Sequence, residues 1–177
     1  MNLLHDISRG ENVPNEINVI IEIPKGSHNK YEINKENNLV ELDRANYSDA
    51  PYPFDYGFVP QTHWEDGDAL DVLVLTTYPL PSLTLVAVRP VGVMEMIDEG
   101  ESDHKIIAVP VKDKRWEGVK DIEDVNKHTL KEIQHFFETY KQLKGSAVNV
   151  PGFKGKAEAH EAIAKSIELY NQKFQKS

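Results

Sequence analysis

Short apolar runs rich in β-branched residues recur through the first two thirds of the chain and predict a mainly β core. They lie at Ile17–Ile23, Lys30–Asn34, Leu39–Arg44, Leu73–Thr77, Leu83–Arg89, Val91–Met96 and Ile106–Val111. Pro24 stops the first run, and Asn37-Asn38 is a turn signal between the second and third, which should therefore form a hairpin. Residues 46–60 carry five aromatic rings and three prolines, which predicts a stiff, irregular, half-buried segment.

The last third of the chain changes to a helical period. Thr129 and Glu132 have the spacing of a capping box, and Gly145 is placed to end the helix that they open. The apolar stripe of this helix consists of Leu130, Ile133, Phe137 and Tyr140. Pro151-Gly152 then breaks the chain before a final helix at about Ala157–Phe174.

Composition and charge narrow the class of protein. A chain of 177 residues, 40% hydrophobic and 28% charged, is typical of one soluble globular domain, which we place at residues 1–177. Its net charge of −9 argues against nucleic-acid and anionic-membrane partners, because both require a basic face. The absence of cysteine excludes disulfides and thiolate chemistry. Residues 1–6 have neither a basic region nor a long apolar run, and no later segment approaches the ~18 apolar residues of a membrane span, so we expect a cytoplasmic protein.

The densest chemistry lies in an acidic turn, Glu65-Asp66-Gly67-Asp68-Ala69-Leu70-Asp71, which places four carboxylates in seven residues just before an apolar strand. Strand alternation should bring Asp66, Asp68 and Asp71 together at one end of that strand. Carboxylates this close repel one another unless a cation lies among them, and hard oxygen ligands suit Mg²⁺ or Mn²⁺. A solvated surface turn is the simple alternative. An EF-hand loop is excluded, because Leu70 stands where that motif requires an acidic or amide ligand, Asp71 where it requires glycine, and Thr77 where it requires glutamate.

A second acidic segment, Asp98–Lys105, also precedes an apolar run, and two such loops at strand ends favour a shared metal site. The seven histidines show neither HxH nor HExxH spacing, which argues against a dedicated zinc site. The chain has no Cys and no Gly-x-Ser-x-Gly, so no protein nucleophile is evident. Carboxylates, cations and phenols at strand ends instead favour attack on a compact phosphate substrate by water activated between metal ions.

The segment Asp66-Gly67-Asp68-Ala69-Leu70-Asp71 resembles the Asp-x-Asp-Pro-x-Asp signature of the soluble family I inorganic pyrophosphatases, with Ala69 where proline is usual. Further motifs follow the family's order: Val19–Pro24, Lys30-Tyr31-Glu32, Asp43-Arg44, Tyr52–Gly57, Arg89–Val93, Asp98-Glu99 through Asp103-x-Lys105, and Phe136–Lys141. The resemblance covers nearly the whole chain. It implies an α+β, mainly β fold, a five-stranded OB-like β-barrel flanked by α-helices, and Mg²⁺-dependent hydrolysis of pyrophosphate to two phosphates.

The resemblance also assigns roles. Metal ligands would be Asp66, Asp71 and Asp103, with Asp98 and Glu32 serving further ions, and Mn²⁺ or Zn²⁺ could substitute for Mg²⁺. The catalytic set would be Asp68, as the general base, with Tyr56, Arg44 and Lys30. The phosphates would be bound by Lys30, Arg44, Tyr56, Lys105, Tyr140 and Lys141, with Glu22 and Tyr52 in support. Bacterial-length members are commonly homohexamers, and the helix at Thr129–Leu143 is a candidate for part of a subunit contact.

Two alternative functions stay open. A hydrolase of a larger phosphate ester, such as a nucleotide, would need room and an aromatic shelf for the base. A non-enzymatic OB-type binding module would leave the acidic clusters unexplained, and an acidic chain is poorly suited to nucleic acid. Faster turnover of nucleotides than of pyrophosphate would favour the first alternative, and no turnover of either would favour the second.

Overall fold

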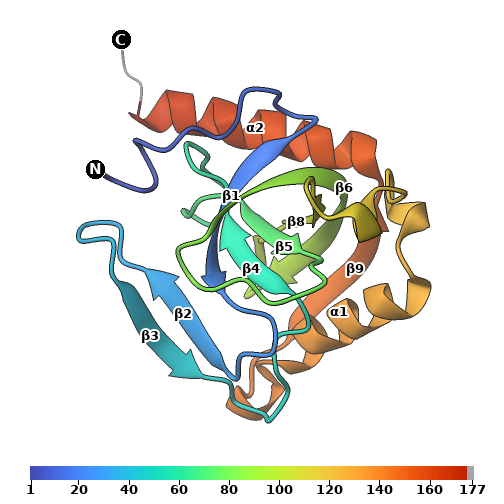
Figure 1. Cartoon of the computed structure of the whole chain (residues 1–177). Coiled ribbons are helices and arrows are strands. Elements are labelled where there is room, and N and C mark those ends of the chain that lie inside the picture. Colours follow the sequence, from blue (N-terminus) through green and yellow to red (C-terminus); the bar gives the residue numbers. More distant parts are fainter. Residues whose placement is uncertain (175–177) are drawn as a thin grey trace.

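Five strands close into a ring at the centre of the fold (Figure 1). The structure is a computed structural model and describes residues 1–174 of the 177. The ring runs through β1 (Ile17–Ile23), β4 (Asp55–Phe58), β5 (Asp71–Val74), β8 (Lys105–Pro110), β6 (Leu85–Asp98) and back to β1. Within it β5 and β8 pair in parallel, and the other neighbours are antiparallel. The predicted five-stranded, OB-like architecture is confirmed.

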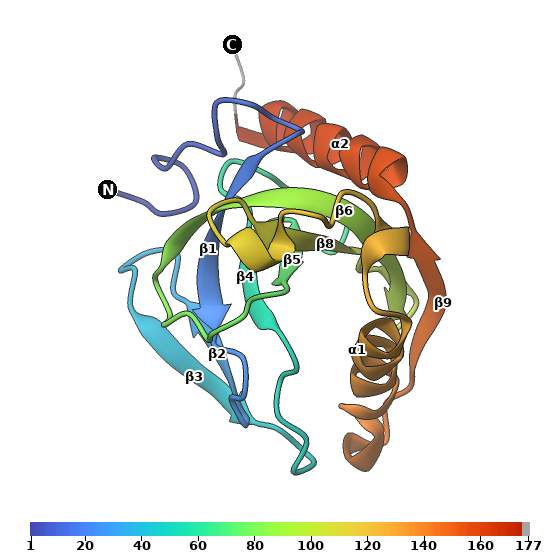
Figure 2. The same ribbon diagram turned by 45° about the vertical axis from the view of Figure 1, so that its right-hand side comes forward.

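Four further strands lie outside this ring. β7 (Glu101–Ser102) and β9 (Val148–Lys154) both pair with β6. β2 (Asn29–Ile33) and β3 (Val40–Ala45) form a separate two-stranded sheet, which is the predicted hairpin. Figure 2 shows this hairpin on the opposite side of the ring from α1.

Two long helices cover the ring. α1 (Lys127–Thr139) packs beside β9, and α2 (Lys156–Phe174) crosses β6. Short 3-10 helices occur at η1 (Lys114–Trp116), η2 (Ile122–Asp124) and η3 (Gln142–Lys144). Among the described residues, no helix combines the length and the apolar character needed to cross a membrane.

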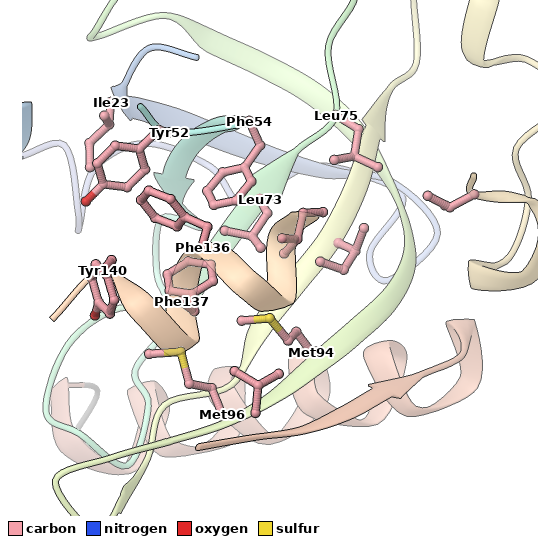
Figure 3. Close-up of a cluster of buried hydrophobic side chains, with 14 of the residues drawn as sticks. Ile23, Tyr52, Phe54, Leu73, Leu75, Met94, Met96, Phe136, Phe137 and Tyr140 are labelled. Atoms are coloured by element: carbon pink, nitrogen blue, oxygen red, sulfur yellow. The ribbon is translucent and has the colours of Figure 1, made fainter. Parts of the chain in front are cut away.

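Both faces of the ring strands are buried, which explains why their sequences are nearly continuous apolar runs. On β5, Leu73 faces a cluster that contains Phe137 of α1. Its neighbours Val72 and Val74 face a second cluster, which contains Ile163 of α2. Figure 3 shows the first cluster, in which aromatic rings of α1 pack against the strands. Each helix therefore covers one face of the same strands.

The prediction of two strands at Leu83–Arg89 and Val91–Met96 was wrong, because Leu85–Arg89 and Val91–Met96 lie in the single 14-residue strand β6. The register between β6 and β8 shifts between Pro90 and Gly92. A proline cannot donate a ladder hydrogen bond, but an irregularity of this kind accommodates it without ending the strand.

Three strands were not predicted. β4 lies inside the aromatic segment that we expected to be irregular, and β9 runs through Pro151-Gly152, which we expected to break the chain. The two-residue strand β7 lies in the second acidic segment, which we expected to be a loop. The helix ends also differ from expectation. Asn126 rather than Thr129 caps α1, and Gly145, with φ of 87°, ends η3 rather than α1. In each case pairing or capping by neighbouring segments overrides the local signal.

Gly57 provides a test of how tightly the ring closes. A Cβ at this position would lie 2.1 Å from the carbonyl oxygen of Ile20, on the paired strand β1. We predict that Gly57→Ala lowers the free energy of unfolding by about 3 kcal/mol, because β1 and β4 would have to move apart. Gly118→Ala is the matched control, since nothing lies within 4 Å of a Cβ there. Urea denaturation measures both, and equal stability of the two variants would contradict the close approach.

Candidate active site

A cavity of about 560 Å³ is lined by residues of the ring, of the β2–β3 hairpin and of the chain that follows α1. Every residue predicted for the site lines this cavity except Tyr52. These residues are Glu22, Lys30, Glu32, Arg44, Tyr56, Asp66, Asp68, Asp71, Asp98, Asp103, Lys105, Tyr140 and Lys141. Positions more than a hundred residues apart in the sequence thus meet at one place.

Strand register places the charged residues of the cavity. Asp71 on β5 and Lys105 on β8 are direct partners across the parallel pair. Lys30 on β2 and Arg44 on β3 are direct partners across the hairpin, so the two cations lie beside each other. The ring therefore pairs opposite charges at one wall of the cavity, and the separate β2–β3 hairpin places two positive charges side by side at another.

Lys105 is the most buried charge in the cavity, with its side chain 3% exposed. Its ammonium donates hydrogen bonds to Asp71 Oδ2 and Asp103 Oδ1, both at 2.8 Å, and to the Tyr56 hydroxyl at 3.0 Å. Burial acts to lower the pKa of Lys105, but Asp71 and Asp103 outweigh it and raise that pKa above its ordinary value. The ammonium is therefore permanently charged and ties β8 to both acidic loops.

Asp66, Asp71 and Asp103 form the part of the cavity best suited to a cation. Each offers a carboxylate oxygen, and the three oxygens lie within 4.8 Å of one another. Gly67 has φ of 99°, which allows the tight turn after Asp66. The amide of Asp68 donates to Asp66 Oδ1 at 3.1 Å and orients that carboxylate.

The crowding of these three carboxylates shifts their pKa values in different directions. Burial, together with the charges of Asp103 and Asp71, raises the pKa of Asp66 to about 7. Burial also raises the pKa of Asp71. Burial acts in the same direction on Asp103, but Lys105 outweighs it and holds the pKa of Asp103 below its usual value. A divalent ion would favour the ionised form of all three, so these residues fit Mg²⁺ or Mn²⁺.

The hairpin supplies the first group of cations. The Lys30 ammonium pairs with Glu32 and lies 3.0 Å from Asp43 Oδ2, and Arg44 donates to the same oxygen at 2.8 Å. Arg44 Nε is buried and has no hydrogen-bond partner within residues 1–174. Arg44 lines the cavity, so its guanidinium can reach an anion there.

A further cation, Lys141, lies just after the end of α1. Lys141 pairs with Asp98 of β6, and the Tyr140 ring lies 5.9 Å from the Arg44 guanidinium. Asp98 Oδ1 is buried, and no described residue makes a hydrogen bond to it. Asp98 therefore keeps one oxygen that is not used by Lys141.

Lys35 was missed in the sequence and Asp43 was noted only within a motif, although each contacts a residue that lines the cavity. Glu22 is buried on β1, where it accepts hydrogen bonds from the Ile33 amide at 2.9 Å and from the Lys35 ammonium at 3.2 Å. Burial raises the pKa of Glu22 in spite of these partners. Lys35 was missed because nothing local links it to Glu22. Asp43 appeared only beside Arg44 in a motif, and its contact with Lys30 depends on the hairpin register.

Tyr52 lies behind the cavity instead of lining it. It is 2% exposed, and its ring centre lies 4.8 Å from that of Phe136 (Figure 3). The distance from the Tyr52 ring centre to that of Tyr56 is 6.2 Å. Burial raises the pKa of its hydroxyl to about 12. Tyr52 thus packs against Tyr56, which does line the cavity and whose hydroxyl donates to Asp71 Oδ2 at 2.5 Å.

Comparison with known proteins gives one consistent result. A family model described as inorganic pyrophosphatase matches residues 19–171. The inorganic pyrophosphatase of Haloferax volcanii is 43% identical over 98% of this chain and 99% of its own length. The crystal structure of inorganic pyrophosphatase from Thermus thermophilus superposes with a TM-score of 0.93 at 43% identity, over 97% of this chain and 99% of that one. For the inorganic pyrophosphatase of Helicobacter pylori the TM-score is 0.90 at 41% identity, over 94% and 99%.

The raised pKa of Asp66 predicts how stability depends on pH when chelator removes divalent ions. Folding raises this pKa from 3.8 to about 7, so the folded chain keeps a proton that the unfolded chain releases, and stability is lost as the pH rises through about 7. We expect a melting temperature roughly 2–4 °C lower at pH 8 than at pH 6. Asp66→Asn should reduce this difference, and scanning calorimetry measures it. An unchanged difference in Asp66→Asn would contradict the assignment.

Proposed function

The chain belongs to the inorganic pyrophosphatase family and hydrolyses pyrophosphate to two phosphates, and we propose that it does so with Mg²⁺ held by Asp66, Asp71 and Asp103. The convergence of these three carboxylates beside the buried ammonium of Lys105 is the observation that carries this proposal. Asp98 and Glu32, which line the same cavity, would serve further ions, and Mn²⁺ or Zn²⁺ could substitute. Bound divalent ions would neutralise part of the substrate's charge and lower the pKa of water near phosphorus.

The cations of the cavity would hold the two phosphates. Lys30 and Arg44 stand side by side across the hairpin, and Lys105 and Lys141 line the same cavity. As the bond to the bridging oxygen breaks, negative charge grows on the leaving phosphate, and these cations would stabilise it. Tyr140 and Tyr56 would add hydroxyl groups, with Tyr56 also fixing the orientation of Asp71.

Asp68 would accept the proton of the attacking water. It lines the cavity two residues from Asp66, on the exposed side of the acidic turn. Its backbone amide orients Asp66, while within residues 1–174 its carboxylate forms no hydrogen bond or ion pair. A carboxylate with this freedom can take a proton, whereas Asp71 and Asp103 are both engaged by Lys105.

The cavity gives little support to a nucleotide substrate. A base would need an exposed aromatic face, and Phe58, which lines the cavity, has the Lys35 ammonium 4.0 Å from its ring centre. The remaining lining is dominated by charged side chains, which suit a compact anion. From the family resemblance we also propose that the chain forms a homo-oligomer, specifically a homohexamer. By the same resemblance we propose that it works in the cytoplasm.

Phosphate release tests the proposed function directly. Pyrophosphate and ATP are supplied in parallel, each with Mg²⁺, with Ca²⁺ and with chelator. We expect fast release from pyrophosphate that requires Mg²⁺ and is suppressed by Ca²⁺, together with much slower release from ATP. Faster release from ATP would favour a nucleotide hydrolase, and no release from either would favour a binding protein.

A pair of substitutions separates proton transfer from metal binding. We predict that Asp68→Asn lowers kcat by about 10²- to 10⁴-fold, the scale of general base catalysis, and leaves metal affinity nearly unchanged. Asp71→Asn should weaken metal binding itself, because it removes a ligand. Steady-state kinetics and metal titration measure the two effects. Equal losses of metal affinity in both variants would show that the division of roles is wrong.

A further inference from the structure

Two of the three carboxylates proposed to bind metal stand on loops rather than on a strand. Asp66 belongs to the turn between Trp64 and Asp68, and Asp103 lies between β7 and β8. The turn is closed by its own backbone, since the Trp64 amide donates to the Asp68 carbonyl at 2.7 Å. This hydrogen bond fixes the shape of the turn but not the distance between the turn and Asp103, so other contacts must set that distance.

Trp64 packs between the two loops and α2. Its side chain is almost fully buried, in the same cluster as Ala159 and Ile163 of α2. Its ring centre lies 5.6 Å from that of His104, which directly follows Asp103. Trp64 therefore touches the loop of each carboxylate on one side and the C-terminal helix on the other.

α2 also holds the acidic turn through charge and hydrogen bonding. The Lys165 ammonium pairs with Glu65 and lies 5.1 Å from the centre of the Trp64 ring. The amide of His63 donates to the carbonyl of Ser166 at 2.9 Å. One turn of α2 thus contacts three consecutive residues directly before Asp66.

Glu65 and Trp64 connect this turn of α2 to both loops. Glu65 directly precedes Asp66 and pairs with Lys165. Trp64 lies beside the Lys165 ammonium, and its ring is also close to that of His104, the residue after Asp103. The contacts of Lys165 therefore reach one proposed metal ligand through Glu65 and the loop of another through Trp64.

We propose that Lys165 is a positioning residue for metal binding, acting through Glu65 and Trp64 to set the spacing between Asp66 and Asp103. None of the described residues that line the catalytic cavity belongs to α2, so Lys165 does not touch substrate. The inference rests on the proposed metal site. It assigns to α2 a task beyond covering one face of the ring.

The sign of the effect separates this role from simple electrostatics. Removing a positive charge near an acidic site tightens cation binding if charge alone matters. Removing a residue that holds two ligands at the correct spacing weakens cation binding instead. Lys165→Met is the informative variant, because it keeps the apolar stem over Trp64 and deletes only the ammonium. The pair is exposed, with side chains 49% and 41% accessible, so the fold should tolerate its loss.

Metal affinity is measured by calorimetric titration of the metal-free chain with Mn²⁺, in the absence of substrate. We expect the Kd of Lys165→Met to rise about threefold, a scale that an exposed ion pair can transmit, while the melting temperature in chelator stays close to that of wild type. Lys165→Arg should restore the Kd. Lys114→Met is the matched control, because its partner Glu117, at 3.6 Å, lies with it in η1 and its C-terminal cap, and neither residue lines the cavity.

A double-mutant cycle with Glu65→Gln completes the test. If Lys165 acts through Glu65, then Lys165→Met should have little further effect on the Kd once Glu65→Gln is present. A Kd for Lys165→Met equal to or below that of wild type would overturn the inference, and so would full additivity in the cycle. A wild-type chain that binds no Mn²⁺ would overturn the proposed metal site and this inference with it, which is a distinguishable result.

Discussion

The buried contact of the Lys105 ammonium with Asp71 and Asp103 is the interaction on which the site depends. An ammonium removed from water is costly unless anions replace its hydration, and here two carboxylates and a phenol hydroxyl surround it. The same contact leaves Asp71 and Asp103 only partly neutralised, because Asp66 brings a third carboxylate into the group. The single positive charge of Lys105 therefore holds Asp71 and Asp103 in place but does not balance the negative charge of all three carboxylates. Divalent ions would supply the remaining positive charge.

The closed ring makes this arrangement rigid. Asp71 and Lys105 meet because β5 and β8 are parallel neighbours in register, and that pairing is fixed on both sides by the antiparallel partners β4 and β6. Each strand is buried on both faces, so α1 and α2 are needed to exclude water from the two clusters. Packing of the whole chain thus determines the position of a few charged atoms.

The charges of the cavity are divided by element. Every aspartate that lines the cavity comes from the two acidic segments, residues 65–71 and 98–105, whereas the hairpin carries Lys30 and Arg44 as neighbours, together with Glu32 and Glu41. A substrate with two phosphates and several bound cations needs both kinds of wall, because metal ions compensate some of its oxygens and side-chain cations compensate others. The overall charge of −9 is consistent with this design, since the positive charge that the substrate requires is supplied locally and by metal.

The sequence by itself determined the local elements and the chemistry. An apolar run ended by Pro24 predicted β1, and alternation with a turn signal predicted the hairpin. Periodicity predicted α2 to within a residue at its start, and the density of carboxylates in the acidic turn indicated a metal site. It could not place β4 or β9, because aromatic rings, proline and glycine give irregular local signals that strand pairing overrides. Nor could it find Lys35 beside Glu22, or separate Tyr52 from the residues that line the cavity. Those facts depend on register and on contacts between distant segments, which only the tertiary structure decides, since a shift of one residue in a strand would turn every side chain to the opposite face.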